Sequence, residues 1–407
     1  MRSSTELRYL IDGHRRGENL AAPFYLHEEI FAHEVSAVLG PQWLMVGHAS
    51  LIPKPGDYFT VDALGAAVVI VRGGNDDINA FHNVCRHRGA RLCEDASGHA
   101  ALFRCRYHGW SYKLSGELAA WRHMPEGLDP AAYGLRRCGV TLFEGLILVS
   151  LLPEAAPDAA KLLAPVREYW ERYDLSACKV AAERTYDITA NWKLCIENNL
   201  ECYHCLPNHP EYTAVNAFVR ADERVPPAAV DEFAAYQRTW AADMGSHGVR
   251  TGRSELVEVA GQLCRAGTWP LAPGKCTASR DGSPLAPLLG RVGRYDESVT
   301  TGCIGFLSYV MATSDYALTV TYLPVDARRT RAVMRWLVRR EAVAGRDYDV
   351  DALCYVWDET TKQDKQLIEI NAAGVGAMGF VPGPYSLLET LAADFVERYL
   401  ALMQASL

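Results

Sequence analysis

The stretch NVCRHRGARLCEDASGHAALFRCRYHGWSY, residues 83–112, decides the first half of the fold because it holds two pairs of metal-binding side chains. Cys85 and His87 form one pair, and Cys105 and His108 form the other. Two thiolates and two imidazoles can bind Zn²⁺, or they can hold a [2Fe-2S] cluster with the thiolates on one iron and the imidazoles on the other. Common zinc fingers pair Cys with Cys and His with His. Because each loop here supplies one of each, the pattern favours the iron-sulfur cluster.

The sequence around this stretch has the pattern of a small all-β domain. Between residues 43 and 151, short apolar runs such as AAVVIV and LILVSL alternate with turn signals such as KPGDYF and RGGNDD. The chain of 407 residues is longer than one hydrophobic core usually supports. We therefore expect at least one further domain.

The composition of the chain disfavours several classes of protein. The formal net charge of -8 argues against a nucleic-acid partner, since phosphate binding needs a basic surface. The N-terminal sequence lacks the apolar core of a signal peptide, and the most apolar stretch, residues 140–152, contains Glu144 and is too short to cross a bilayer. The 12 cysteines do not form the framework of a secreted domain. We expect a cytoplasmic protein without a membrane partner, whose cysteines are reduced or bind metal.

A second group of candidate ligands lies in the string NWKLCIENNLECYHCLPNHPEY, residues 191–212. Helical spacing over residues 190–205 would place Glu197, Glu201 and His204 on one stripe of a helix. Pro207 is expected to bend the chain after Cys205, so that His209 returns toward His204. Two imidazoles and a carboxylate with open positions suit a non-haem Fe(II) that binds oxygen.

A zinc site is the alternative interpretation of the same string. Cys202 and Cys205 form a CxxC motif, and together with His204 and His209 they could bind Zn²⁺. This assignment would leave the inward-facing acids Glu197 and Glu201 without a role. In an iron site, by contrast, a carboxylate can orient a histidine through its second ring nitrogen.

A long C-terminal helix carries a third candidate ligand. It is expected to begin after Asp349 as N-cap and to run to Ala373, with Gly374 as its stop. Asp364 falls on its apolar stripe, where a carboxylate is costly unless it is paired or bound to metal. A buried salt bridge is the simpler interpretation, whereas Asp358 is expected on the outer face. Before this helix, strands are expected over 316–323 and 330–339, and residues 225–287 show no clear pattern.

Taken in order, these motifs resemble the large (alpha) subunits of the Rieske non-haem iron oxygenases. The resemblance covers nearly the whole chain and is strongest to the glycine betaine and stachydrine N-demethylases. It rests on CRHRG, CRYHGW, NWK, ENNLECYHC, NHPE, VWDETTKQDKQLIEIN and PGPYS. It implies an α+β fold, with an N-terminal segment 1–42 packed on the catalytic domain, an all-β Rieske domain 43–155 and a catalytic domain 156–407 whose antiparallel sheet is flanked by helices.

The resemblance also implies which residues act. Glu201 takes the place of a carboxylate that links the cluster histidine of one subunit to the iron histidine of the next, in a ring of three subunits. The implied residues are Cys85, His87, Cys105 and His108 for the cluster, His204, His209 and Asp364 for Fe²⁺, and Glu201 and Asn198 for catalysis.

The implied reaction uses O₂ and electrons that NAD(P)H delivers through a ferredoxin or flavin reductase. The substrate is a small molecule, and hydroxylation of an N-methyl group would release formaldehyde from a betaine-like amine. Residues 305–320 depart from the version of this stretch in the betaine subgroup, so hydroxylation or N-oxygenation of another small molecule stays open. A Rieske electron carrier and a zinc-stabilised binding protein are the alternatives of other classes. A cation-binding aromatic cage could come from Phe306, Tyr309, Tyr316, Tyr322 and Trp357.

Overall fold

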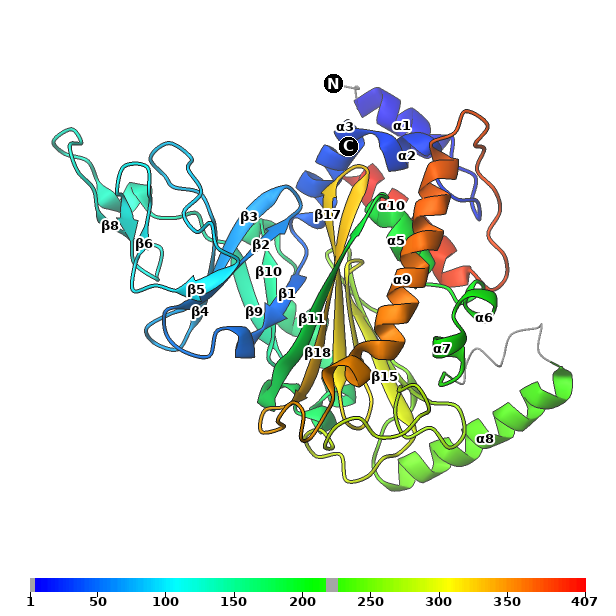
Figure 1. The fold of residues 1–407 in the computed structure, drawn as a ribbon. Coiled ribbons are helices and arrows are strands. Elements are labelled where there is room, and N and C mark those ends of the chain that lie inside the picture. The colour runs from blue at the N-terminus through cyan, green and yellow to red at the C-terminus, as the bar shows by residue number, and fades with distance from the viewer. Residues whose placement is uncertain (1–3, 217–225) are drawn as a thin grey trace.

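The computed structural model describes residues 4–216 and 226–407, and residues 1–3 and 217–225 lie outside the described part. Figure 1 shows a β-rich region, coloured blue to cyan, beside a larger region built on one broad sheet. The cluster motif lies at the far tip of the β-rich region. No helix in the described ranges is long and apolar enough to cross a membrane.

The β-rich region contains three small antiparallel sheets. Their strand orders are β1-β10-β9, β4-β3-β2-β5 and β6-β7-β8. Val69, Phe81 and Tyr112 belong to a separate hydrophobic core that surrounds Cys85 and Cys105. The strands are β1 (Leu44–His48), β2 (Asp57–Ala63), β3 (Ala66–Arg72), β4 (Ile78–His82), β5 (Ser97–His99), β6 (Phe103–Arg104), β7 (Ser111–Tyr112), β8 (Leu118–Ala120), β9 (Gly139–Phe143) and β10 (Leu146–Ser150).

The larger region is organised around an eight-stranded antiparallel sheet with the order β11-β18-β17-β16-β15-β14-β12, in which β13 also pairs with β14. Both faces of its central strands are covered, which explains why β17 and β18 are almost continuously buried. The strands are β11 (Cys178–Ile188), β12 (Gly252–Arg253), β13 (Val257–Val259), β14 (Gln262–Pro270), β15 (Ser298–Ile304), β16 (Ser308–Ala312), β17 (Ala317–Asp326) and β18 (Arg329–Arg339).

Helices cover one face of this sheet. The long helix α9 crosses it beside β11, α5 packs against both α9 and α10, and α10 also contacts the N-terminal helix α1 (Figure 1). Asp349 caps α9 as expected, because its side chain accepts a hydrogen bond from the Ala352 N–H. The helices are α1 (Ser4–Asp12), α2 (Ala22–Leu26), α3 (Glu28–Glu34), α4 (Ala159–Leu163), α5 (Trp192–Asn199), α6 (Cys205–Asn208), α7 (Pro210–Thr213), α8 (Pro227–Ser246), α9 (Val350–Val375) and α10 (Thr390–Ala405).

The expected elements of the second half are mostly found. The strands expected over 316–323 and 330–339 are β17 and β18, which pair with each other as a hairpin. The helix expected to end at Ala373 continues to Val375. Of the segment 225–287, residue 225 lies outside the described residues, and the remainder contains α8, β12, β13 and β14.

The single helix expected over residues 190–205 is wrong. Helix α5 begins after Asn191, whose side chain accepts from the Lys193 N–H, and it ends at Asn199. The Glu201 carboxylate accepts from the Tyr203 and His204 N–H groups, so local side-chain bonds replace the helical ladder there.

The expected role of Pro207 is also wrong. The chain bends before Cys205 and again at His209, whereas Pro207 lies within the first turn of α6, where its missing N–H costs no hydrogen bond.

Candidate active site

The two loops of the cluster motif have the same backbone geometry. In one loop the Cys85 N–H donates to Ala90 O and the Gly89 N–H donates to Cys85 O. In the other loop the Cys105 N–H donates to Trp110 O and Gly109 donates to Cys105 in the same way. Both glycines have positive φ, at 81° and 77°, which lets each loop turn tightly behind its cysteine. The repeated geometry aims one thiol and one imidazole from each loop at a common point.

The four side chains of this motif converge as the sequence predicts. The Cys85 and Cys105 side chains are both buried, and burial raises the pKa of the Cys85 thiol. His87 Nδ1 and His108 Nδ1 lie 3.2 Å apart. Two buried sulfurs and two facing imidazole nitrogens fit a group that two thiolates and two neutral histidines bind together. Cys93, which fits no ligand position, is buried in the surrounding core, and its carbonyl accepts from Asn83.

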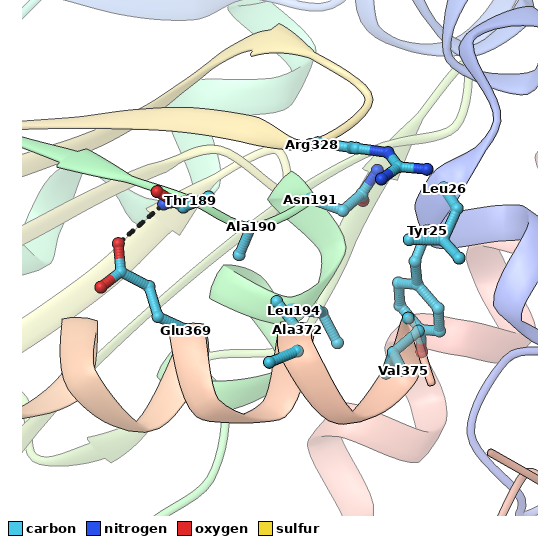
Figure 2. Close-up of a pocket in the computed structure, with 12 residues that line it drawn as sticks. Tyr25, Leu26, Thr189, Ala190, Asn191, Leu194, Arg328, Glu369, Ala372 and Val375 are labelled. Atoms are coloured by element: carbon cyan, nitrogen blue, oxygen red, sulfur yellow. Dashed lines mark hydrogen bonds between the residues drawn. The ribbon is translucent and has the colours of Figure 1, made fainter. Parts of the chain in front are cut away.

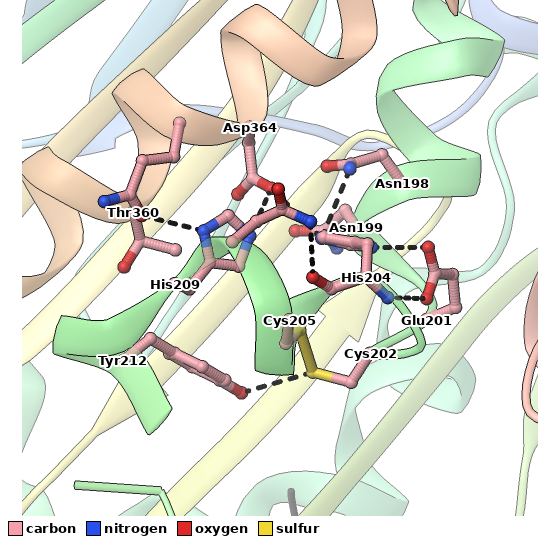
Figure 3. Close-up of polar contacts among 12 residues, drawn as sticks. Asn198, Asn199, Glu201, Cys202, His204, Cys205, His209, Tyr212, Thr360 and Asp364 are labelled. Atoms are coloured by element: carbon pink, nitrogen blue, oxygen red, sulfur yellow. Dashed lines mark hydrogen bonds and ion pairs between the residues drawn. A yellow bond between two sulfur atoms is a disulfide. The ribbon is translucent and has the colours of Figure 1, made fainter. Parts of the chain in front are cut away.

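The second predicted site also comes together in three dimensions. His204 precedes α6, His209 follows it, and Asp364 reaches them from α9 (Figure 3). Asp364 Oδ1 lies 3.2 Å from His204 Nε2 and 2.9 Å from His209 Nε2. Asp358 cannot take this place, because it accepts a hydrogen bond from Tyr186 and pairs with Lys362.

The surroundings of these three side chains suit a bound cation. His209 Nε2 is buried and has no partner with hydrogen-bond geometry within the described residues, although Asp364 lies beside it. Both ring nitrogens of His204 face carboxylates, with Glu201 Oε1 2.5 Å from Nδ1. Burial opposes protonation of His204, yet hydrogen bonds to Asp364 and Glu201 raise its pKa to about 9. Two imidazoles and one carboxylate that share a point fit Fe(II).

Two residues that the sequence analysis missed hold His209 in place. Gln363 Oε1 accepts from His209 Nδ1 at 2.8 Å, and Gln363 Nε2 donates to Glu211 Oε2 at 2.9 Å. This chain fixes the His209 tautomer that leaves Nε2 free to bind a metal. The sequence does offer a signal for these two residues. Gln363 directly precedes Asp364, and Glu211 lies two positions after His209.

The two predicted catalytic residues lie at different nitrogens of the His204 ring. Glu201 accepts from Nδ1, and Asn198 Nδ2 lies 3.3 Å from Nε2 (Figure 3). Glu197 does not share this position, because its half-buried carboxylate accepts from the Tyr25 and Tyr385 hydroxyls. The expected stripe of Glu197, Glu201 and His204 on one helix does not form, because Glu201 contacts His204 whereas Glu197 contacts two tyrosines elsewhere.

The expectation that the cysteines are reduced or bind metal is wrong for one pair. Cys202 and Cys205 form a disulfide. The Cys205 sulfur lies within 4.8 Å of the ligand atoms of His204 and His209. Because this sulfur is bonded to Cys202, the zinc set of Cys202, His204, Cys205 and His209 does not form.

A large cavity adjoins Asp364. Its volume is about 630 Å³, and it lies between α9, α10 and the face of the sheet formed by β14 to β18. Of the expected cage residues, Phe306, Tyr309, Tyr322 and Trp357 line it. Tyr316 does not, because it is fully buried behind Trp357, whose indole N–H donates to the Tyr316 hydroxyl.

A second cavity of about 420 Å³ lies between α2, α5 and α9. Figure 2 shows Tyr25, Arg328 and Glu369 around it, with Glu369 accepting from the Thr189 N–H. None of the predicted cluster, iron or catalytic residues lines this cavity. The cavity beside Asp364 is therefore the candidate substrate site.

Comparison with known families agrees with both halves of the molecule. Residues 42–140 match the Rieske [2Fe-2S] domain. Residues 175–277 and 307–405 match the catalytic domain of the ring hydroxylating alpha subunit.

Known proteins resemble the chain over most of its length. The glycine betaine monooxygenase oxygenase subunit of Chromohalobacter salexigens is 37% identical over 95% of this chain and 86% of its own. The corresponding subunit of Pseudomonas aeruginosa PAO1 is 35% identical over 90% of this chain and 85% of its own. The carnitine monooxygenase oxygenase subunit of Escherichia coli K12 is 33% identical over 48% of this chain and 53% of its own.

Solved structures share the fold. A quaternary ammonium Rieske monooxygenase in complex with L-carnitine has a TM-score of 0.69 at 20% identity, with 98% of both chains covered. Naphthalene 1,2-dioxygenase bound to phenanthrene has a TM-score of 0.69 at 22% identity, covering 96% of this chain and 93% of the other. The protein is thus an O₂-dependent oxidoreductase with a [2Fe-2S] cluster and a mononuclear iron, and the chain belongs to the Rieske non-haem iron oxygenase family.

Proposed function

We propose that this chain is the oxygenase component of an N-demethylase for a betaine-like quaternary or tertiary amine. The observation that carries the proposal is the position of Asp364 Oδ1 between the Nε2 atoms of His204 and His209, at the wall of the large cavity. In this proposal these three residues hold Fe²⁺, and Cys85, His87, Cys105 and His108 hold the cluster. The cluster is reduced by NAD(P)H through a separate reductase.

The cavity walls support a cationic substrate. Tyr309, Tyr322 and Trp357 present aromatic rings to the cavity, and such rings attract ammonium groups through their π-faces. The full-length relatives named above act on glycine betaine. Buried apolar walls also exclude water from the reacting group.

The chain positions the reaction and the iron supplies the chemistry. The bound iron would supply reductive activation of O₂. Substrate, O₂, two electrons and two protons give the hydroxylated amine and water, and the hydroxymethyl group then leaves as formaldehyde. Glu201 and Gln363 accept from the Nδ1 atoms of His204 and His209, which keeps both Nε2 atoms directed at the metal.

The test combines metal analysis with product analysis. We expect about three irons per chain, two of them from the cluster with acid-labile sulfide, and formaldehyde from small N-methyl amines in the presence of a surrogate reductase. Zinc without sulfide would contradict the proposed cofactor sites. Oxygen incorporation without formaldehyde would reject demethylation and favour hydroxylation or N-oxygenation, the second candidate, which the departure of residues 305–320 from the betaine subgroup supports.

The assembly and location are part of the proposal. We expect a cytoplasmic ring of three subunits, in which electrons pass from His108 of one subunit through Glu201 to His204 of the next. His108 is exposed and Glu201 already contacts His204, which supports this route.

Mixed rings test the route. A Cys85→Ala chain and a His204→Ala chain should each be inactive alone. Hybrids isolated with two tags should recover part of the activity, because an intact cluster then faces an intact iron. Inactive, iron-replete hybrids would mean that electrons travel within one chain.

A further inference from the structure

The large cavity extends far beyond the iron ligands. One row of paired residues crosses its floor from strand to strand. Successive cross-strand pairs join the members of this row, and every member lines the cavity. The row consists of Met334 on β18, Val320 on β17, Tyr309 on β16, Cys303 on β15 and Arg265 on β14.

The two ends of this row differ in chemistry. At the first end, the Thr361 hydroxyl lies 3.1 Å from the Met334 sulfur, and Asp364 lies one turn further along α9. Arg265 lies at the other end. Neighbouring strands are about 4.8 Å apart, so four strand spacings put the Arg265 backbone about 19 Å from that of Met334. The reacting end and the cationic end of the cavity are therefore well separated.

The guanidinium of Arg265 has no hydrogen-bond or ion-pair partner in the part of the chain that the structure describes. Its Nε is buried without a hydrogen bond, and the group forms no ion pair with any residue in the described ranges. Two other half-buried or buried arginines are paired, Arg172 with Asp296 and Arg335 with Glu183. An unsatisfied charged donor is costly, so an anion that binds there would be favoured. Burial, followed by repulsion from Arg253, lowers the pKa of Arg265.

Neighbouring charges leave this end of the cavity positive. Arg253 is exposed and lies over the Trp269 ring at 5.8 Å, and Arg398 is paired with Glu258. Asp394 also lines the cavity, but it forms no ion pair with Arg265 among the residues described. Among the described residues, Arg265 and Arg253 both line the cavity without an ion pair, and the attraction of Asp394 for Arg265 is weaker than the repulsion from Arg253.

We propose that Arg265 determines substrate specificity by binding a carboxylate at the far end of the substrate, while the N-methyl end lies at the iron ligands. A guanidinium matches a carboxylate with two parallel hydrogen bonds. The apolar row between the two ends suits a spacer of several methylene groups. In glycine betaine a single methylene separates nitrogen and carboxylate, which is too short for this separation. The position of the N-methyl end rests on the proposed function. The binding of the carboxylate by Arg265 rests on the cavity alone.

The test uses trimethylammonio carboxylates with one, four and eight methylene groups, each beside its neutral amide. Formaldehyde release is measured with the holoenzyme and a surrogate reductase. Binding of nonanoate and nonanamide is measured separately by calorimetry, without turnover. The variants are Arg265→Gln and Arg265→Lys. The matched control is Arg331→Gln, because Arg331 lies on β18 and pairs with Asp187 but does not line the cavity.

We expect the longest acid to have the lowest KM and nonanoate to bind far better than nonanamide. Arg265→Gln should weaken the acids at least about 30-fold while leaving the amides unchanged, because it removes one partner of a desolvated charge pair. Arg265→Lys should restore part of the preference for the acids, and Arg331→Gln should retain the wild-type preference.

Equal binding of acid and amide by the wild type, or the best turnover with one methylene, would overturn the inference. If Arg265→Gln does not fold, the acid-to-amide ratio of the wild type still decides. Carboxylate binding that depends on Arg265, with no formaldehyde from any amine, would reject demethylation and leave the inference intact.

Discussion

The proposed cluster loops and the proposed iron site differ in how the protein holds their candidate metal ligands. The cluster residues lie within residues 85–108, in two loops that repeat one backbone geometry at the tip of the β-rich region. The iron residues come from α9 and from the turns around α6, and they lie against a buried network. Of the histidines, His108 is exposed, whereas His209 is only 1% exposed.

The two regions therefore depend on different interactions for the positions of their candidate ligands. Local turns and hydrogen bonds hold the proposed cluster ligands, so their geometry is largely independent of the large sheet. The proposed iron ligands depend on the packing of α5, α9 and the N-terminal helices. Damage to distant packing should therefore reach the iron site and spare the cluster.

The largest expected effect comes from removing ligands. His204→Ala, His209→Ala or Asp364→Ala should reduce oxygenation to background, because each removes a proposed iron ligand. The visible absorption and EPR signal of the reduced [2Fe-2S] cluster should be unchanged. Cys85→Ala should also be inactive in oxygenation, but it should lose the cluster spectrum and retain about one iron per chain. Loss of both metals in every variant would contradict the independence of the two regions.

The sequence predicts the cluster region better than the iron region for the same reason. Cys85, His87, Cys105 and His108 are recognised from spacing alone, because short loops hold them. Asp364 is recognised only as an inward acid on a helix, and its role depends on a contact with residues more than a hundred positions away, which family resemblance supplies. The stripe through Glu197, Glu201 and His204 is wrong because Glu201 ends the helix by bonding to its own backbone neighbours.

The next largest effect is expected on stability. Lys193 and Glu34 form a fully buried ion pair at 2.5 Å, and Tyr399 and Trp192 also donate to Glu34. Lys193→Met would leave the Glu34 charge buried without its partner and lower the free energy of unfolding by about 3–5 kcal/mol.

Urea denaturation of the iron-replete protein measures this loss. The control is Lys113→Met, which breaks an exposed pair with Glu117 in the cluster region and should leave stability unchanged. Equal effects of the two variants would show that burial does not distinguish the regions.

A pH effect is expected from Glu197. Burial raises the pKa of this carboxyl to about 7, although hydrogen bonds from Tyr25 and Tyr385 oppose the shift. The unfolded chain titrates near 4.5, so the native state binds the proton more tightly. The protonated Glu197 carboxyl therefore stabilises the folded state by at most about 3 kcal/mol. This stabilisation is complete below pH 4.5 and is lost as the pH rises toward 7.

Glu197→Gln should remove this dependence. The free energy of unfolding, measured between pH 4.5 and 8, should fall less steeply in the variant than in the wild type. If the pH dependence of the free energy of unfolding were the same in both proteins, Glu197 would be ionised, not protonated, in the folded state.

A smaller effect is expected from the residue that orients His209. Gln363→Leu removes the acceptor of the Nδ1–H at nearly constant size. Such partners of metal-binding histidines contribute 10- to 100-fold to metal affinity or activity, so we expect roughly that loss in iron affinity by chelator competition. Glu359→Gln on the same helix is the control, and its affinity should match the wild type. An unchanged affinity in Gln363→Leu would mean that the packing around His209 alone fixes its ring.

The smallest effect is expected at the cluster, because local hydrogen bonds already fix its proposed ligands. A hydrogen-bond partner of a ligand, such as Tyr112, can then change only the reduction potential of the cluster. The Tyr112 hydroxyl lies 3.4 Å from Cys85 Sγ and also accepts from the Arg86 N–H. With a thiolate ligand the hydroxyl must donate, and this bond stabilises the reduced, more negative cluster. Tyr112→Phe should therefore lower the reduction potential, by about 60 mV if the bond contributes about 1.4 kcal/mol to a one-electron couple.

Tyr133→Phe is the matched control, because its ring packs edge-on to Trp110 near the cluster. Protein-film voltammetry measures both potentials. A loss of the cluster in Tyr112→Phe would show that this region, too, depends on partners beyond its loops, and the contrast with the iron site would then be one of degree.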